Sequence, residues 1–122
     1  MEWDFKKGVP IYTQIIERVE FDLLSGKYQP GDKMPSVRDF AMEAGVNPNT
    51  MQKAFSEMER MGLIYTERTS GRYVTTDRDR IHSLKDELSA RYVDEFFEIL
   101  HSLGFTDNEI LNTVKEKCKG DN

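Results

Sequence analysis

Two amide side chains, Asn49 and Gln52, stand three residues apart in the segment NPNTMQKAF. An asparagine or glutamine can form two hydrogen bonds at once with adenine, and such a contact discriminates between bases by about 1–3 kcal/mol. Arg38, Thr50 and Lys53 lie nearby in the sequence and offer the charges and the hydroxyl group that bind phosphate oxygens. These residues favour recognition of a nucleic acid, with an ordinary solvated surface as the alternative.

Length and composition bound the fold and the environment. A chain of 122 residues with 38% hydrophobic and 32% charged residues indicates one compact domain with an appendage. No apolar run is long enough to cross a membrane, and the start of the chain lacks the apolar core of a signal peptide, so we expect a cytoplasmic protein. The net charge of −5 requires any nucleic-acid face to be local, and the single cysteine, Cys118, excludes an intrachain disulfide.

Catalysis has little support in the sequence. The two histidines, His82 and His101, are nineteen residues apart and lack the spacing of metal ligands. The chain has no glycine-rich phosphate loop, and no nucleophile has an evident base. We therefore expect no enzyme activity, no metal site and no cofactor.

These polar side chains need helices to position them. The first expected helix begins after Pro10, because proline suits the first turn of a helix. Apolar residues recur at helical spacing until Gly26, and a Pro-Gly pair with Pro35 then predicts a loop over residues 26–35. The apolar stripe of this helix consists of Ile11, Tyr12, Ile15, Ile16, Val19 and Leu23.

Two further helices follow, separated by a tight turn. Ser36 with Asp39 forms a cap for a short helix, Gly45 ends it in a left-handed conformation, and Asn47 followed by Pro48 begins the next one. Two helices joined in this way must cross steeply, which predicts a helix-turn-helix. An ordinary helical hairpin in a small bundle is the alternative.

The second helix of this motif should bury Met51, Phe55 and Met58 along one side. The outward residues are then Asn49, Lys53, Ser56 and Arg60, with Gln52 at the edge of that face. Asn47 has two interpretations. It is either a helix cap alone or a residue whose neighbouring free amides also bind phosphate.

The next segment, GLIYTERTSGRYVTT, alternates apolar and polar residues on both sides of a polar turn, which predicts a β-hairpin. Ile64 and Val74 are the expected inward residues, because a two-stranded hairpin is marginal unless it packs against something. Arg68 and Arg72 lie around Gly71 at the expected tip. A hairpin directly after a helix-turn-helix is a wing.

The remaining residues predict two helices. A helix over 78–103 would be about 39 Å long, and Thr106 with Glu109 forms a capping box for a shorter one. The apolar stripe of the long helix is either laid on its own domain or covered by a second subunit, because a soluble monomer rarely exposes so large an apolar patch. We expect a dimer interface at Ile81, Leu84, Leu88, Tyr92, Phe96, Ile99, Leu100 and Leu103.

The segments PIYTQI, PSVRDFA, GVNPNTMQKAF and GLIYTERTSGRYV, taken in this order, resemble the GntR family of bacterial transcription regulators. The short C-terminal region resembles the YtrA-like branch. The resemblance implies a winged helix-turn-helix domain over 1–77 and a two-helix dimerisation region over 78–122, in a mainly α-helical fold with a small β-hairpin. It also implies DNA contacts from Arg38, from Asn47, Asn49, Thr50 and Gln52, and from the wing around Gly71.

We therefore expect a homodimeric, sequence-specific DNA-binding regulator. Its expected role is to repress its own operon and a linked ABC transporter from an inverted-repeat operator. The full set of expected DNA-binding residues is Arg38, Asn47, Asn49, Thr50, Gln52, Lys53, Arg68, Gly71 and Arg72. A small-molecule effector is conceivable but is not identified by the sequence. The alternative function is a winged helix that binds a protein partner without specific DNA binding.

Overall fold

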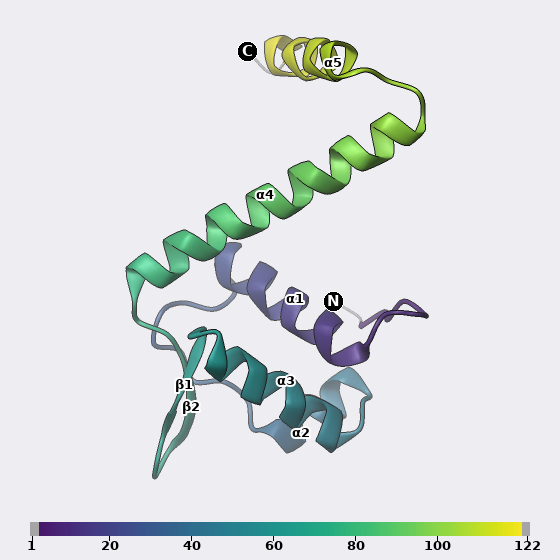
Figure 1. The fold of residues 1–122 in the computed structure, drawn as a ribbon. Helices are drawn as coiled ribbons and strands as arrows, with labels where there is room; N and C mark the ends of the chain where they lie inside the picture. Colours follow the sequence, from purple (N-terminus) through teal and green to yellow (C-terminus); the bar gives the residue numbers. More distant parts are fainter. Residues whose placement is uncertain (1–2, 121–122) are drawn as a thin grey trace. The chain divides into compact units, whose positions relative to one another are not determined.

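The structure is a computed structural model that describes residues 3–120. These residues form five helices and a two-stranded antiparallel hairpin (Figure 1). In chain order the elements are α1 (Ile11–Leu24), α2 (Val37–Ala44), α3 (Pro48–Arg60), β1 (Ile64–Glu67), β2 (Gly71–Val74), α4 (Arg78–Ser102) and α5 (Asp107–Gly120). The chain divides into two compact units: the first ends at Leu84, and the second begins at Lys85. This division lies inside α4, a few residues beyond the expected boundary between 77 and 78.

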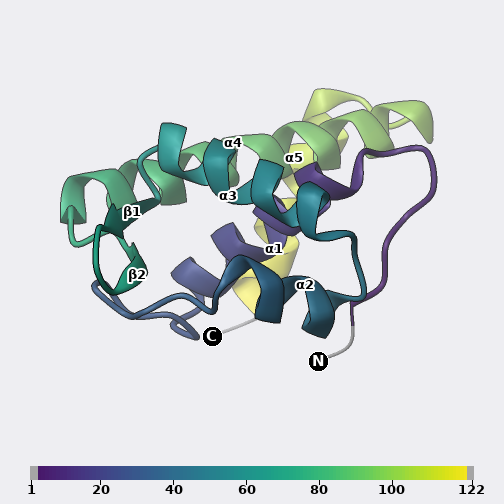
Figure 2. The same ribbon diagram turned by 90° about the horizontal axis from the view of Figure 1, so that it is seen from below.

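The first unit is built around α3, which packs against α1, α2 and β1 (Figures 1 and 2). The prediction that one side of α3 is buried is confirmed, because Met51, Phe55 and Met58 are inaccessible to solvent. Phe55 meets Phe40 of α2 edge to face, with their ring centroids 5.9 Å apart. The core contributed by α1 consists of Ile15, Ile16, Val19 and Leu23.

Local hydrogen bonds fix the turn between α2 and α3. The Ser36 hydroxyl accepts from the backbone N–H of Asp39 at 3.0 Å, so α2 begins at the expected cap. Gly45 ends α2 with a φ of 70°, a left-handed conformation that disfavours any residue with a side chain. Asn47 Oδ1 accepts from the N–H of Asn49 at 2.7 Å and begins α3. The predicted helix-turn-helix is confirmed.

The hairpin follows α3 and projects from its C-terminal end (Figure 1). Ile64 pairs with Val74 in the ladder, and both are buried as predicted. Gly71 lies in β2 opposite Glu67, whereas the sequence placed it in the turn. Its φ of 119° explains why a glycine stands there.

The loop over 26–35 supports the hairpin in a way that the sequence did not predict. Lys33 forms an isolated antiparallel bridge with Tyr73 of β2. The N–H of Val74 donates to the carbonyl of Asp32 at 2.8 Å. The wing is therefore held by backbone bonds on the outer side of β2 as well as by its contact with α3, which stabilises an element that is marginal alone.

The start of α4 belongs to the first unit. Arg80 Nε donates to the carbonyl oxygen of Met61 at 2.8 Å, and Leu84 is fully buried. The Arg80 hydrogen bond joins the first turn of α4 to the end of α3.

The second unit contains the rest of α4 and α5. The predicted capping box of α5 is confirmed: the N–H of Thr106 donates to Glu109 Oε1 at 3.0 Å, and the N–H of Glu109 donates to the Thr106 hydroxyl at 3.2 Å. The backbone N–H of Thr106, and after it the Thr106 side chain, lower the pKa of the Glu109 carboxyl group. His101 Nε2 lies 2.5 Å from Asp107 Oδ1, so a polar contact joins the end of α4 to the start of α5.

Candidate DNA interface

The outward face of α3 carries the residues expected to read bases. Asn49, Gln52 and Lys53 are exposed, and Thr50 is half-buried. Burial of the opposite side of α3 leaves this face free of contacts with the core. The structure therefore brings four of the expected residues together on the first two turns of one helix.

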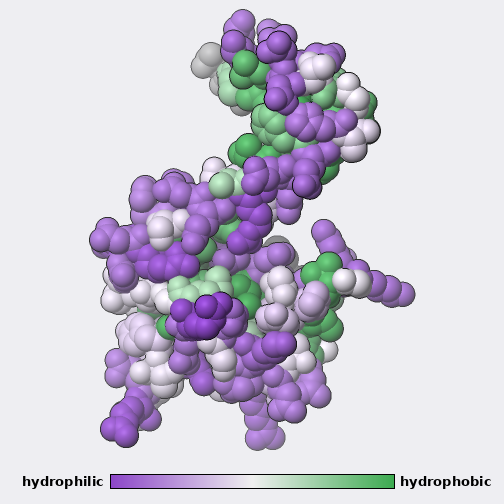
Figure 3. Space-filling view, viewed as in Figure 1, coloured by the Kyte–Doolittle hydropathy of each residue, from purple (hydrophilic) through white to green (hydrophobic). Residues whose placement is uncertain are grey.

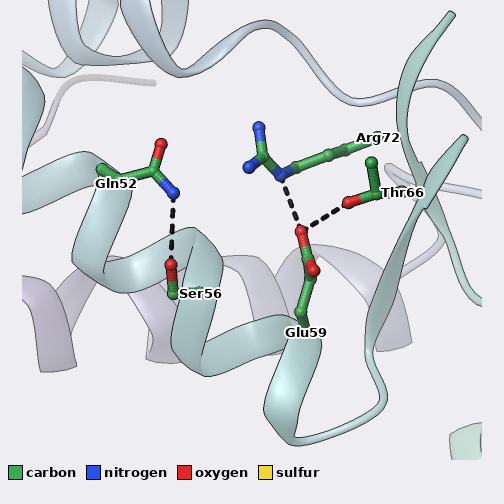
Figure 4. A network of polar contacts seen from close by, with 5 residues as sticks. All are labelled: Gln52, Ser56, Glu59, Thr66 and Arg72. Carbon is green, nitrogen blue, oxygen red and sulfur yellow. Dashed lines mark hydrogen bonds and ion pairs between the residues drawn. The ribbon is translucent and has the colours of Figure 1, made fainter. Parts of the chain in front are cut away.

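Gln52 has a defined orientation on this face. Its Nε2 donates to the hydroxyl oxygen of Ser56 at 3.1 Å, one turn further along α3 (Figure 4). One amide N–H and Oε1 of Gln52 stay available for a base edge. The sequence placed Ser56 on the outward face without assigning it this contact.

The start of α3 and the start of α2 provide sites for phosphate. Arg38 is the second residue of α2 and is exposed. The first turn of α3 contains no acidic residue, so its free N–H groups and the positive end of the helix dipole favour an anion. Asn47 caps α3 with its side-chain oxygen, so its capping role is confirmed and its contribution to phosphate binding stays a prediction.

The wing arginines differ from each other. Arg68 is exposed in the turn, whereas Arg72 is half-buried and its Nε lies 2.8 Å from Glu59 Oε1 of α3. The Thr66 hydroxyl donates to the same oxygen at 2.7 Å, so Glu59 holds both strands of the wing (Figure 4). The guanidinium of Arg72 also lies over the Phe55 ring, 5.5 Å from its centroid. Arg72 therefore fixes the wing to α3, a role that sequence reasoning missed.

We expect Glu59 to stabilise the fold in a pH-dependent way. Hydrogen bonds from Thr66 and then Arg72 lower the pKa of Glu59. A carboxyl group with a lowered pKa stabilises the folded chain above the pKa of the unfolded chain, and this contribution is lost as the pH falls through the folded pKa. Glu59→Gln should lower the free energy of unfolding at pH 7 by roughly 0.5–1 kcal/mol, after allowance for the screening of a partly exposed pair.

Urea unfolding at pH 7 and pH 3 tests this expectation. The difference between the wild type and Glu59→Gln should shrink as the pH falls from 7 toward 3, because the wild-type carboxyl group takes up a proton as the pH passes through its lowered pKa. Glu67→Gln is the matched control, because Glu67 lies on the hairpin that Glu59 holds and forms no ion pair among residues 3–120. An equal difference at both pH values would contradict the assigned role of the ionised Glu59.

The positive charge of this surface is local. Arg38, Lys53 and Arg68 are exposed and have no salt bridge within the described part of the chain. Arg60, further along α3, is paired with Glu57, and its hydrogen bond lowers the pKa of that carboxyl group. Two of the three unpaired cations lie on the helix-turn-helix and the third on the wing. This distribution matches the local face that the net charge of −5 requires.

Between residues 3 and 120, no group of three or more histidine, cysteine, aspartate or glutamate side chains is placed to hold a metal ion. None of the helices in that range is both long and apolar enough to cross a membrane.

Three packed helices, a short turn between α2 and α3, and a hairpin after α3 define a winged helix-turn-helix protein. Residues 11–74 match the bacterial regulatory proteins of the gntR family. The chain therefore belongs to the GntR family of transcriptional regulators, whose members bind DNA.

Two relatives from Bacillus subtilis are similar over most of their length. The uncharacterized HTH-type transcriptional regulator YhcF is 37% identical over 98% of this chain and 99% of its own. The HTH-type transcriptional repressor YtrA is 36% identical over 77% of each chain.

Solved structures agree with this assignment. A GntR family transcriptional regulator from Listeria monocytogenes is 36% identical, covers 92% of this chain and 98% of its own, and superposes with a TM-score of 0.82. The DNA-binding domain of AraR in complex with operator ORE1 is 25% identical over 62% of this chain and 94% of its own, with a TM-score of 0.53.

Proposed function

We propose that this protein is a homodimeric repressor that binds an inverted-repeat operator in the cytoplasm and blocks transcription of its own operon and a linked ABC transporter. The observation that carries the proposal is the outward face of α3, where Asn49, Gln52 and Lys53 are exposed, together with the exposed Arg38 at the start of the preceding helix. Asn49 and Gln52 read bases, and Arg38, Thr50, Lys53 and Arg68 bind phosphates. The similarity to the repressor YtrA supports the direction of regulation.

The exposed apolar residues of the second unit support a dimer. Tyr92, Phe96, Ile99 and Leu103 are all exposed, whereas Leu84 and Leu88 of the same stripe are buried within the single chain. Leu111 and Val114 of α5 are exposed as well. Figure 3 shows hydrophobic residues at the surface of this unit, at the top of the view. A second copy of the chain would remove this apolar surface from water.

Twofold symmetry sets the geometry of the operator. Two copies of α3 related by a twofold axis enter major grooves about 34 Å apart or a multiple of that distance, so the two half-sites form an inverted repeat. An effector, where one acts, would change the separation of the two winged units and so weaken the fit to this spacing.

The first experiment titrates the protein against the DNA upstream of its own gene by fluorescence anisotropy, at several salt concentrations. We expect selective binding with two protomers per site, and an affinity that falls steeply as salt rises. Two copies of the chain carry a charge of −10, twice −5, so binding to unrelated DNA should be weak.

A scrambled duplex of the same length is the control. Equal affinity for both duplexes at physiological salt would contradict sequence-specific binding. The alternative function, a winged helix that serves only a protein partner, predicts no binding to either duplex.

A further inference from the structure

A surface hollow lies between the start of α1 and the start of α3, within the first unit. Its α3 side consists of three residues already placed on the DNA-binding face. Its α1 side consists of residues that have no part in the site described so far. The lining residues are Pro10, Ile11, Tyr12, Asn49, Thr50 and Lys53.

Lys53 is held at this hollow by an aromatic ring. Its Nζ lies 4.1 Å from the centroid of the Tyr12 ring, within the range of a cation–π interaction. Lys53 forms no salt bridge among residues 3–120, and its charge acts on the Glu57 carboxylate only at longer range, so the ring of Tyr12 is the close contact that restricts its ammonium group. A free lysine side chain loses conformational entropy when it binds a phosphate, and a side chain that is already restricted loses less.

The charge of the residues that line the hollow favours an anionic ligand. No aspartate or glutamate lines it, and the first turns of α1 and α3 contain no acidic residue, although the chain has 22 acidic residues against 17 lysines and arginines. The lining therefore combines one unpaired cation with hydrogen-bond donors and no competing carboxylate. This chemistry suits a phosphate group, and the continuity with the outward face of α3 makes the phosphate one of the DNA backbone.

We propose that Tyr12 is a positioning residue for DNA binding: its ring orients the ammonium group of Lys53 toward a backbone phosphate at the hollow between α1 and α3. The proposal rests on the proposed function and extends the DNA-binding surface to the first turn of α1. Tyr12 acts through Lys53 and not through its hydroxyl group, so a phenylalanine should replace it.

The test measures DNA binding of Tyr12→Leu, Tyr12→Phe, Lys53→Met and the Tyr12→Leu/Lys53→Met double variant, by fluorescence anisotropy over a range of salt concentrations. Lys53→Met should weaken binding to the upstream DNA and to a scrambled duplex by the same factor and reduce the salt dependence by about one phosphate contact per protomer. Tyr12→Leu should weaken binding by roughly two- to fivefold per protomer. It should have no further effect when Lys53 is already methionine, and Tyr12→Phe should bind like the wild type.

Phe21→Leu is the matched control, because Phe21 is an exposed aromatic residue of the same helix that has no lysine over its ring in the described structure. It should leave DNA binding unchanged. Equal weakening by Tyr12→Leu with and without Lys53 would show that Tyr12 supports the fold and not Lys53, and a silent Tyr12→Leu would show that Lys53 needs no positioning. Either result overturns the inference.

The scrambled duplex separates this inference from the proposed function. If the wild type binds both duplexes equally, the proposal of a specific operator is wrong. The effects of the Tyr12 and Lys53 variants on salt-dependent binding still test whether Tyr12 positions Lys53. Absence of binding to any duplex at low salt would overturn both.

Discussion

Replacing Ile99 by lysine is expected to convert the protein into a monomer that binds its operator at least about a hundredfold more weakly. Joining two binding units raises the combined affinity by roughly 10²–10⁴ over that of one unit, and a monomer loses this gain. The side chain of Ile99 is 59% exposed in the single chain, so a lysine has room there and leaves the helix intact. In a dimer, the same lysine would bury a charge in an apolar contact.

Ala90→Lys is the matched control for this prediction. Ala90 is exposed on α4, nine residues before Ile99, and 100° per residue places it on the opposite side of the helix. Both variants add one positive charge, which by itself favours DNA binding, so weaker binding by Ile99→Lys alone cannot come from charge.

Sedimentation equilibrium gives the mass of each variant and anisotropy gives its operator affinity. We expect about 14.2 kDa for Ile99→Lys and twice that value for Ala90→Lys. A dimeric Ile99→Lys would contradict the assignment of this stripe to the subunit interface. A monomer with unchanged operator affinity would contradict the need for two half-sites.

The parts of the fold that could be predicted depend on residues close together in the sequence. Ser36 with Asp39, Gly45, and Asn47 with Pro48 mark the ends of α2 and α3, because each forms its bonds within a few residues. The buried side of α3 follows from helical spacing alone. These signals are local, so one sequence was sufficient to locate the helix-turn-helix and its outward face.

The contacts that could not be predicted join residues far apart in the sequence. Glu59 and Arg72 are thirteen residues apart, and Tyr12 and Lys53 are forty-one apart. The sequence placed Arg72 at the wing tip because it lies next to a glycine, but the ladder pairs Gly71 with Glu67 and places the Arg72 side chain against α3. Neither the spacing of apolar residues nor a helix-capping motif indicates which distant residues form such pairs. The exposed face of α3 could therefore be located from the sequence, while the partners that orient its side chains required the structure.

Arg38→Ala is expected to abolish most DNA binding while the dimer stays intact. Arg38 is exposed at the start of α2 and has no salt bridge within residues 3–120, so its guanidinium is free for a phosphate. A hydrogen bond to a charged group contributes about 1.5–3 kcal/mol, and a dimer makes this contact twice, which gives about 3–6 kcal/mol. Because every 1.4 kcal/mol changes the affinity tenfold, the loss should be at least about a hundredfold.

The type of loss distinguishes phosphate binding from base reading. Arg38→Ala should weaken binding to the operator and to a scrambled duplex alike and reduce the salt dependence by about one contact per protomer, whereas Gln52→Ala should weaken binding to the operator alone. Arg78→Ala is the matched control, because Arg78 is an exposed arginine at the first position of α4, outside the proposed interface. Unchanged DNA binding by Arg38→Ala would count against the whole assignment, since α2 would then lie away from the DNA. A loss confined to the operator would instead mean that Arg38 reads bases, and the roles of α2 and α3 would have to be exchanged.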